Sequence, residues 1–408
     1  MDHHQQRFGR PRGEDRPLST LARGSVVPAG RVVGLDVARC VALLGMIGTH
    51  TLSSDAPGGS ALVHEVAGGR SSALFALLAG VSMALMSGRT RPEHGGTATR
   101  TEARLFLRAL LVALIGLLLG ELDTNVAVIL TYYGLLFCLG IPFLRLTWKP
   151  LAALAAVWLI VGPVLSHLVR PALPAPSYVS PSFAAVDDPW QLLTELLFTG
   201  YYPAVPWLAY LLAGMAVGRL TLSSVKVAAV LAIGGQVVAL VAKVASALLV
   251  DSGDVRGTLI RTYVGPGDPE LAEILNEGLF GTTPTASWWW LAVSGPHTGT
   301  PFDLAHTIGT GLSVIGIALL FSAVAPKVFA VVFGAGAMTL TLYSLHVVLL
   351  VPQAWSEDSM GSFLKHSALI LVIGAVYRLL GRSGPLERAL ALVTKVVVPD
   401  RRPVASSR

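Results

Sequence analysis

The chain has 408 residues, of which 53% are hydrophobic and only 13% are charged. Soluble domains carry roughly 25% charged residues, so this composition excludes an ordinary soluble protein. The net charge of +6 comes mainly from Lys and Arg at the ends of apolar runs, which indicates membrane orientation and not nucleic-acid binding. We therefore expect an all-α, multi-pass integral membrane protein with lipids around it and no nucleic-acid partner.

The N-terminal segment, residues 1–30, is rich in Arg, Pro and Gly and has no apolar period. Such a segment cannot bury enough apolar surface to fold, so we predict a disordered basic cytoplasmic tail. It lacks the apolar stretch and small-residue cleavage site of a signal peptide. Residues 31–390 are predicted to form a single transmembrane domain, and residues 391–408 a second cytoplasmic tail.

Apolar runs near the roughly 20 residues that span a bilayer recur along the domain. Two shorter stretches, 190–199 and 286–293, contain tryptophan and are expected to lie at the membrane interface. About ten transmembrane helices are predicted, over residues 32–52, 70–88, 104–120, 125–144, 150–169, 201–219, 226–250, 303–325, 328–352 and 363–381.

The orientation follows from the basic residues. If ten spans alternate and both the N-terminus and the C-terminus are cytoplasmic, 24 of the 30 Lys and Arg residues fall on the cytoplasmic side. The positive-inside rule favours this arrangement. Two long loops, 170–200 and 251–302, then lie on the outer side, and loops of this length are often functional.

The first predicted span, "RVVGLDVARCVALLGMIGTH", carries Asp36 and Arg39 three residues apart on one helical face. Further arginines stand at the cytoplasmic ends of other spans. The arginine fork suits phosphate, so these residues are candidates for an anion site, although orientation and pairing with lipid headgroups explain them equally. The inner group consists of Arg39, Arg104, Arg108, Arg145 and Arg219.

Polar residues also converge on the outer side, where five of the spans contribute them. Polar groups at membrane depth are costly unless they face protein or water, and a shared outer cavity would satisfy them together. The alternative explanation is that these residues lie at helix ends and contact lipid headgroups. For His346 the alternative is a hydrogen bond between helices. The outer group includes His50, His64, Arg70, Glu121, Asp123, Asn125, Thr131, Tyr132, Tyr133, Asp303, His306, Thr341, Tyr343 and His346.

The stretch "PHTGTPFDLAHTIGTG" opens the eighth predicted span. Thr300 can cap the helix, Pro301 fits its first turn, and the helix dipole favours a carboxylate at Asp303. His306 lies three residues later on the same face, where the carboxylate would orient its imidazole. We expect Asp303 and His306 to line the outer cavity, with His297 in the loop before them.

Several motifs together resemble one family. The first span is similar to the pattern R-x-x-x-L-D-x-x-R-G-x-A-x-x-G-M of the heparan-α-glucosaminide N-acetyltransferase-like and YeiB-like membrane proteins, with Cys40 in place of the usual Gly. "ALFALLAGVSMAL" (73–85) resembles the second family span. "GAMTLTLYSLHVVL" (336–349) resembles the late string G-x-M-x-L-T-x-Y-x-x-Q, but Leu342 and His346 replace Asn and Gln.

The C-terminal "GPLERAL" resembles the family's G-P-L-E-x-x-x-R, with Arg388 one place early. The resemblance thus reaches both ends of the domain, whereas residues 150–300 match only loosely. It implies a transmembrane acyltransferase that takes an acyl group from cytoplasmic acyl-CoA and delivers it to a sugar across the membrane. The departures at Leu342 and His346 leave the acceptor open.

Acyl transfer to a hydroxyl or amine needs a general base, and histidine suits this role. The family's catalytic histidine stands in the first outer loop before x-x-x-x-G, which His64 in "HEVAGG" matches. His50, which lies closer to the membrane, is the alternative candidate for the base. Asp303 and His306 are expected to assist whichever histidine is the base. The predicted acceptor-binding residues are His297, Tyr132, Tyr343 and His346. The predicted donor-binding residues are Asp36, Arg39, Arg104, Arg108 and Arg145.

The expected co-substrate is acetyl-CoA or another acyl-CoA, with an acyl-carrier protein as the open alternative. No metal site and no permanently bound cofactor are predicted. The expected acceptor is an extracytoplasmic glycan or glycolipid of the cell envelope. A permease or flippase for a lipid-linked sugar is the second hypothesis, and an acyl- or lipid-binding scaffold without catalysis is the third. The missing internal repeat weakly disfavours transport.

Overall fold

The computed structural model describes residues 26–53, 59–263, 270–277, 279–355 and 359–399. Throughout these ranges the chain forms helices joined by turns and loops, and no strand occurs in them, which confirms the predicted all-α class. The predicted tail 1–30 lies almost wholly outside them, as do parts of loop 251–302 and of tail 391–408. The α-helices are α1 (Val33–Thr51), α2 (Gly59–Ala67), α3 (Arg70–Met86), α4 (Gly95–Gly120), α5 (Leu130–Gly140), α6 (Trp148–Val169), α7 (Pro189–Thr194), α8 (Ala204–Gly218), α9 (Val225–Val250), α10 (Val255–Thr262), α11 (Leu271–Glu277), α12 (Pro301–Val324), α13 (Pro326–Val332), α14 (Thr339–Leu349), α15 (Met360–Leu379) and α16 (Pro385–Val397).

Short irregular helices extend or connect these elements. One of them, η5, is a π-helical turn that follows α7 directly. The others are 3₁₀ turns, which are typical of helix ends and connections. The full set, with η5 included, is η2 (Ile141–Phe143), η3 (Arg170–Ala172), η4 (Phe183–Asp187), η5 (Glu195–Thr199), η6 (Trp288–Ala292) and η7 (Gly334–Ala337).

Seven helices of the described chain are long and apolar enough to cross a membrane. An eighth candidate is a bent pair, Pro189–Thr199 with Ala204–Gly218, whose axes differ by 53°. Two shorter apolar helices, Leu130–Phe143 and Thr339–Leu349, occupy the remaining predicted spans. The seven long helices span Val33–Thr51, Leu62–Met86, Gly95–Gly120, Trp148–Ala172, Val225–Val250, Pro301–Val324 and Met360–Leu379.

The ninth predicted span, 328–352, is not one helix. It is divided into α13, the η7 turn and α14. The division lies where glycines let other elements approach closely: a Cβ atom at Gly336 would overlap the backbone of Asp36, and one at Gly334 would overlap Gly374. Glycine is the residue that permits such contacts between membrane helices. α14 therefore starts in the interior of the molecule, beside α1.

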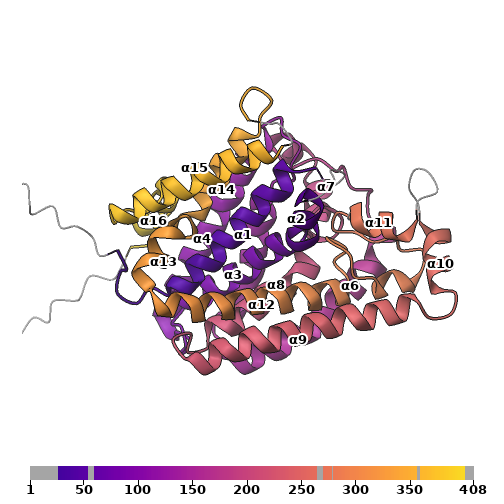
Figure 1. Ribbon diagram of the computed structural model, residues 1–408, viewed down its shortest axis with the longest axis horizontal. Helices are drawn as coiled ribbons and strands as arrows, with labels where there is room; N and C mark the ends of the chain where they lie inside the picture. Colours follow the sequence, from indigo (N-terminus) through magenta and orange to yellow (C-terminus); the bar gives the residue numbers. More distant parts are fainter. Residues whose placement is uncertain (1–25, 54–58, 264–269, 278, 356–358, 400–408) are drawn as a thin grey trace, which may run out of the picture.

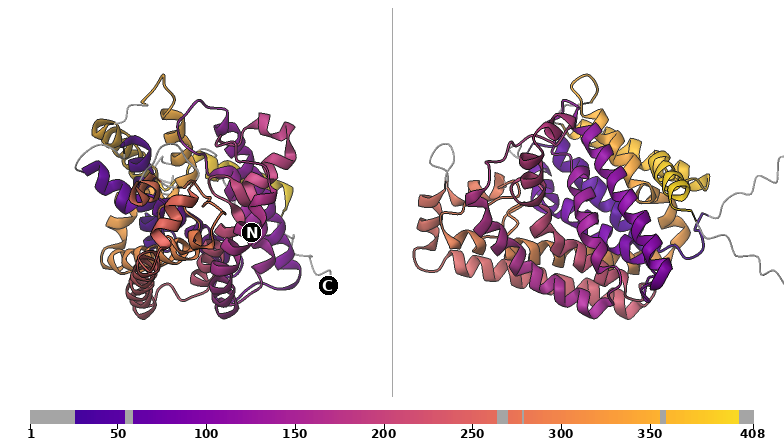
Figure 2. Two further views of the ribbon diagram at one scale, coloured as in Figure 1. Left: turned by 90° about the vertical axis from the view of Figure 1, so that its right-hand side faces the viewer. Right: turned by 180° about the vertical axis from the view of Figure 1, so that it is seen from behind.

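Helices α1, α3 and α8 form the centre of the molecule, whereas α9 and α12 pack against each other along one edge (Figure 1). Seen from behind, α15 and α16 lie on the opposite side from this pair (Figure 2). Every residue of α8 except Val205 is buried, which is the behaviour of a helix that is apolar all round. Its contact with α3 depends on Gly80 and Gly214, where a Cβ atom would overlap carbonyl groups of the partner helix.

A smaller cluster of apolar residues joins α10, α11, η6 and the end of α9. Trp290 is its fully buried centre, and the Trp290 indole donates a hydrogen bond to Thr262 Oγ1 (3.0 Å). Its neighbours Trp288 and Trp289 are exposed. The predicted interfacial stretch 286–293 therefore has one buried indole and two at the surface.

Candidate functional site

A cavity of about 560 Å³ lies between α1, the C-terminal half of α3 and the middle of α4, and the segment before α1 also lines it. This volume lies within the roughly 300–1,000 Å³ of small-molecule sites. Four arginines line the cavity, together with two acidic residues. The lining charged residues are Arg31, Arg39, Arg89, Arg108, Asp36 and Glu387.

Asp36 is buried and is surrounded by arginines. Its carboxylate accepts hydrogen bonds from Arg31 Nε (2.6 Å) and Nη2 (2.8 Å) and from Arg39 Nη1 (3.1 Å). Arg378 of α15 lies 3.8 Å away, and its Nε and Nη2 have no hydrogen-bond partner in the described chain. Arg39 also donates to Ser82 Oγ (2.9 Å). The predicted Asp36–Arg39 pair is present, but one carboxylate faces three guanidinium groups, so positive charge remains in excess.

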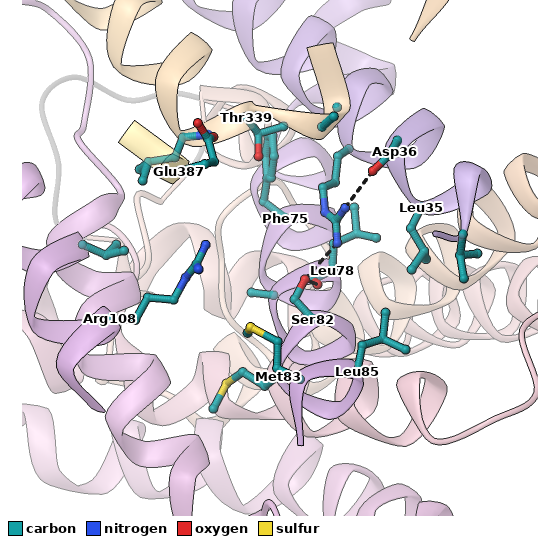
Figure 3. A pocket seen from close by; sticks show the side chains of 18 of the residues that line it. Leu35, Asp36, Phe75, Leu78, Ser82, Met83, Leu85, Arg108, Thr339 and Glu387 are labelled. Atoms are coloured by element: carbon teal, nitrogen blue, oxygen red, sulfur yellow. Dashed lines mark hydrogen bonds and ion pairs between the residues drawn. The ribbon is translucent and has the colours of Figure 1, made fainter. Parts of the chain in front are cut away.

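Arg108 and Glu387 enter the cavity from α4 and α16 (Figure 3). The Glu387 carboxylate accepts hydrogen bonds from the backbone N–H of Leu340 (2.9 Å) and Thr341 (3.2 Å) and from Thr341 Oγ1 (2.5 Å). The Glu387 side chain of α16 thereby caps the first turn of α14. Within the described chain the Arg108 guanidinium makes no hydrogen bond, so its donors are available to a ligand.

Two of the predicted donor-binding arginines lie elsewhere. Arg104 donates to the carbonyl of Val398 (2.9 and 2.8 Å) and so connects α4 with the end of α16. Arg145 is exposed and forms a salt bridge with Glu102 (2.8 Å). Neither residue lines the cavity. Of the predicted donor set, the structure brings Asp36, Arg39 and Arg108 together there.

Arg219, the fifth arginine of the inner group, has a structural role. It is buried, and its guanidinium donates to the carbonyl oxygens of Ala84 (2.9 Å), Ser87 (3.1 Å) and Arg89 (2.7 Å) and to Ser87 Oγ (2.9 Å). It also contacts Leu144 and Leu146 of the α5–α6 connection. These bonds satisfy carbonyl groups at several helix ends, so Arg219 connects these ends and has no donors left for a ligand.

The end of the cavity farthest from Arg31 and Arg89 is lined by apolar and aromatic side chains. Phe75, Leu78, Val112 and Phe137 line it, and Met46 stands at its far end on α1. Tyr133 donates to the carbonyl of Ser72 (2.7 Å), and the Tyr343 hydroxyl accepts from the backbone N–H of Ile129 (3.3 Å). Tyr343, which was predicted to bind the acceptor, lines this cavity.

Beyond that end, three histidines and a carbonyl group form a continuous chain of hydrogen-bonding contacts. His50 Nδ1 lies 3.1 Å from His346 Nε2, and His346 Nδ1 lies 2.8 Å from His366 Nδ1. His366 Nε2 lies 3.3 Å from the carbonyl oxygen of Trp355. His50 and His346 were predicted at this end, whereas His366 was missed because nothing near it in the sequence marks it.

His64 and His297 lie near His50. His64 lies in α2, and its Nε2 lies 2.6 Å from the carbonyl oxygen of Leu52, to which it donates. His297 has a left-handed backbone (φ +54°), and its ring contacts Tyr202 with ring centroids 5.8 Å apart. Burial lowers the pKa of His297 to about 4, so this imidazole is neutral at pH 7.

The start of α12 differs from the expectation in one respect. Thr300 caps the helix through the N–H of Asp303 (3.1 Å), as predicted. The Asp303 carboxylate, however, accepts from the N–H of Gly299 (2.9 Å). His306 contacts the carbonyl of Ala239 through Nδ1 (3.0 Å) and accepts from Arg70 Nε at its Nε2 (3.1 Å). Both ring nitrogens of His306 therefore have hydrogen-bond partners. The Ala239 carbonyl and Arg70 orient the imidazole, and Asp303 does not.

Tyr132 is buried, and its hydroxyl accepts from the backbone N–H of Tyr201 (3.3 Å). Tyr201 in turn contacts two exposed aromatic residues with left-handed backbones, Tyr178 (φ +54°) and Phe280 (φ +41°). Bulky residues rarely adopt this conformation, and such strain is often found at functional sites. This aromatic cluster (Tyr178, Tyr201 and Phe280) joins the loop before α7, the segment before α8 and the loop after α11.

A family model described as heparan-alpha-glucosaminide N-acetyltransferase, catalytic, matches residues 31–246. The matched segment includes Asp36, Arg39, His50, His64 and Arg108, whereas α12 to α16 lie beyond it. No curated protein matches the chain.

Proposed function

Because the chain belongs to the family of heparan-alpha-glucosaminide N-acetyltransferase catalytic domains, we propose that it is a membrane acyltransferase with a cytoplasmic donor and an outer acceptor. The donor is an acyl-CoA such as acetyl-CoA, and the acceptor is a glycan or glycolipid of the cell envelope. In this proposal the protein resides in the cell membrane and modifies a glycan that the donor itself cannot reach.

The proposed topology has ten spans and two cytoplasmic termini. The seven long helices, the bent pair and the two shorter apolar helices would together make ten crossings. The described chain begins and ends at the same side of the molecule, at the left of Figure 1, as an even number of crossings requires. The distribution of Lys and Arg supports placing that side in the cytoplasm.

The observation that carries the proposal is the position of the cavity between the arginines at one end and the histidines beyond the other. It begins among arginines that suit the phosphates of CoA. It ends at Met46, one helical turn before His50 on the same face of α1, a rise of about 6 Å. A CoA molecule whose phosphates lie at the mouth would place its thioester in the apolar end, directly below the histidines.

His50 is the general base in this proposal. His64 donates its Nε2 hydrogen to Leu52, whereas Nε2 of His50 has no hydrogen-bond partner in the described chain. The acceptor hydroxyl or amine attacks the thioester carbonyl and gives its proton to His50 Nε2. A C–O or C–N bond forms, the C–S bond breaks, and the departing sulfur takes up the proton, which yields the acylated acceptor and free CoA thiol.

The acceptor side comprises the remaining predicted residues. His297 lies near His50, and its ring contacts Tyr202, the neighbour of Tyr201 in the aromatic cluster. Aromatic faces with a few polar groups are suited to hold a sugar, which presents both C–H and O–H groups. Arg70 and His306 lie on the same side and supply a guanidinium and an oriented imidazole.

The test uses protein in proteoliposomes with acetyl-CoA carrying a radioactive acetyl group trapped inside and glucosamine outside as the probe acceptor. Proteoliposomes with their cytoplasmic side inward should acetylate the external glucosamine, and the His50→Ala variant should not. Binding of acetyl-CoA should be the same in both proteins.

A protein that does not bind acetyl-CoA but equilibrates labelled glucosamine across the vesicle wall would be a permease. That outcome would overturn the proposal. Binding of acetyl-CoA without transfer to any amine or hydroxyl probe would instead indicate a binding scaffold.

A further inference from the structure

The chain of histidines described above has only one set of protonation states when all three rings are neutral. A carbonyl oxygen can only accept, so the contact with Trp355 requires the hydrogen of His366 on Nε2. Its Nδ1 is then an acceptor, and the contact of 2.8 Å requires the hydrogen of His346 on Nδ1. His346 Nε2 must therefore accept from His50 Nδ1.

This sequence of donors and acceptors reaches the proposed base. With the hydrogen of His50 on Nδ1, the lone pair of Nε2 is the free one. We propose that His346 and His366 are positioning residues that hold His50 in this tautomer and orientation, so that Nε2 can accept the proton of the acceptor. The inference rests on the proposed acyl transfer and assigns a task to two residues beyond the matched family segment.

The geometry supports a fixed chain. The rings of His50 and His346 are nearly parallel (6°), with centroids 5.3 Å apart, which suits a hydrogen bond that lies in both ring planes. His366 is turned by 84° to His346 and directs its Nε2 toward Trp355. His346 and His366 are fully buried, and the Trp355 carbonyl also accepts from Ser362 Oγ (3.1 Å), which holds that end in place.

The arrangement also favours the charged intermediate of the reaction. When His50 takes up a proton on Nε2, its Nδ1–H becomes a charge-assisted donor to His346, and such bonds are shorter and stronger than neutral ones. The positive charge then lies beside an oriented acceptor and not in an apolar environment. A wrong tautomer would place a hydrogen where the lone pair is needed and would abolish base catalysis.

The experiment compares His366→Leu with His366→Gln. Glutamine can donate to Trp355 and accept from His346, whereas leucine can do neither. We expect His366→Leu to lower kcat roughly 100-fold with an unchanged KM for acetyl-CoA, and His366→Gln to remain close to the parent protein. Equal kcat values in the two variants would overturn the inference.

A second measurement does not depend on activity. In protein labelled with ¹⁵N-histidine, the imidazole shifts report which nitrogen of His50 carries the hydrogen. We expect Nδ1–H in the parent protein and in His366→Gln, and a mixture of tautomers in His366→Leu. A hydrogen on Nε2 of His50 in the parent protein would contradict the inference, whether or not acyl transfer is found. If His366→Leu does not fold, the parent protein and His366→Gln still give the decisive spectra.

Discussion

Single residues distinguish the cavity from the rest of the surface that we propose to be cytoplasmic. Arg108 is half-buried, points into the cavity and makes no hydrogen bond within the described chain (Figure 3). Arg145 is exposed, forms a salt bridge and lies outside the cavity. The two residues have the same chemistry in different environments, so they form a matched pair for testing the donor site.

We expect Arg108→Ala to weaken acetyl-CoA binding roughly 10- to 100-fold, because hydrogen bonds to charged groups contribute about 1.5–3 kcal/mol. Arg145→Ala should leave the affinity unchanged. Isothermal titration of the purified protein with CoA measures both. Equal loss in the two variants would mean that general surface charge, and not the cavity, attracts the donor.

A pH effect follows from His297. Its pKa in the folded protein is about 4, below the unfolded value of about 6.5, so the unfolded chain binds more protons between these values. The contribution of His297 should therefore make the protein less stable as the pH falls from 6.5 towards 4. We expect the apparent Tm to decrease over this interval and the decrease to be smaller in His297→Gln. An identical pH dependence in the two proteins would contradict this prediction.

The sequence predicted much of the residue-level site and missed specific parts of it. Asp36 and Arg39 were predicted as a pair because they are three residues apart on one helix. Arg378 and His366 were not identified, because they reach their partners only through the packing of α15 against α1 and α14. Spacing along the chain gives local contacts, whereas contacts between distant elements require the fold.

At the level of elements, the important feature is the junction of α14 and α16. The first turn of a helix leaves backbone N–H groups without partners, and Glu387 accepts from two of them. A carboxylate at this position is also favoured by the helix dipole. Because Glu387 and Thr339 both line the cavity, this junction forms part of its wall.

We expect Glu387→Ala to destabilise the protein by about 1–2 kcal/mol, because part-buried donors of α14 lose their acceptor. The backbone amides of Leu340 and Thr341 should exchange faster with deuterium. Arg388→Ala, one residue later on the exposed side of α16, is the control and should leave their exchange unchanged. Unchanged exchange in Glu387→Ala would show that α16 does not hold α14.

Hydropathy predicted most of the long helices correctly but did not predict the division of the ninth span. The long helices coincide with predicted spans because burial in lipid requires a continuous apolar run. The division of the ninth span was not predicted, because the η7 turn depends on the contacts of Gly334 and Gly336 with other helices. An average over apolar residues does not contain this information.

For the whole molecule, the proposed topology makes a direct prediction. Single cysteines at positions 95 and 260, introduced after replacement of Cys40 and Cys138, report on the two sides of the membrane. We expect a membrane-impermeant thiol reagent to label position 260 in intact cells and position 95 only after the membrane is opened. Protection of position 260 in intact cells would overturn the orientation.

The cavity also has a consequence for the energetics of the cell. Its lining ends at Met46, Tyr133 and Tyr343 and does not reach His50. The charged phosphates of a bound donor therefore stay on one side of the bilayer. In the proposed reaction an acylium equivalent moves outward while a proton moves inward to the sulfur, so no net charge is displaced. Moving one charge across 100 mV would cost about 2.3 kcal/mol, and this reaction avoids that work. Its rate should therefore be independent of the membrane voltage, and many copies could operate without discharging it.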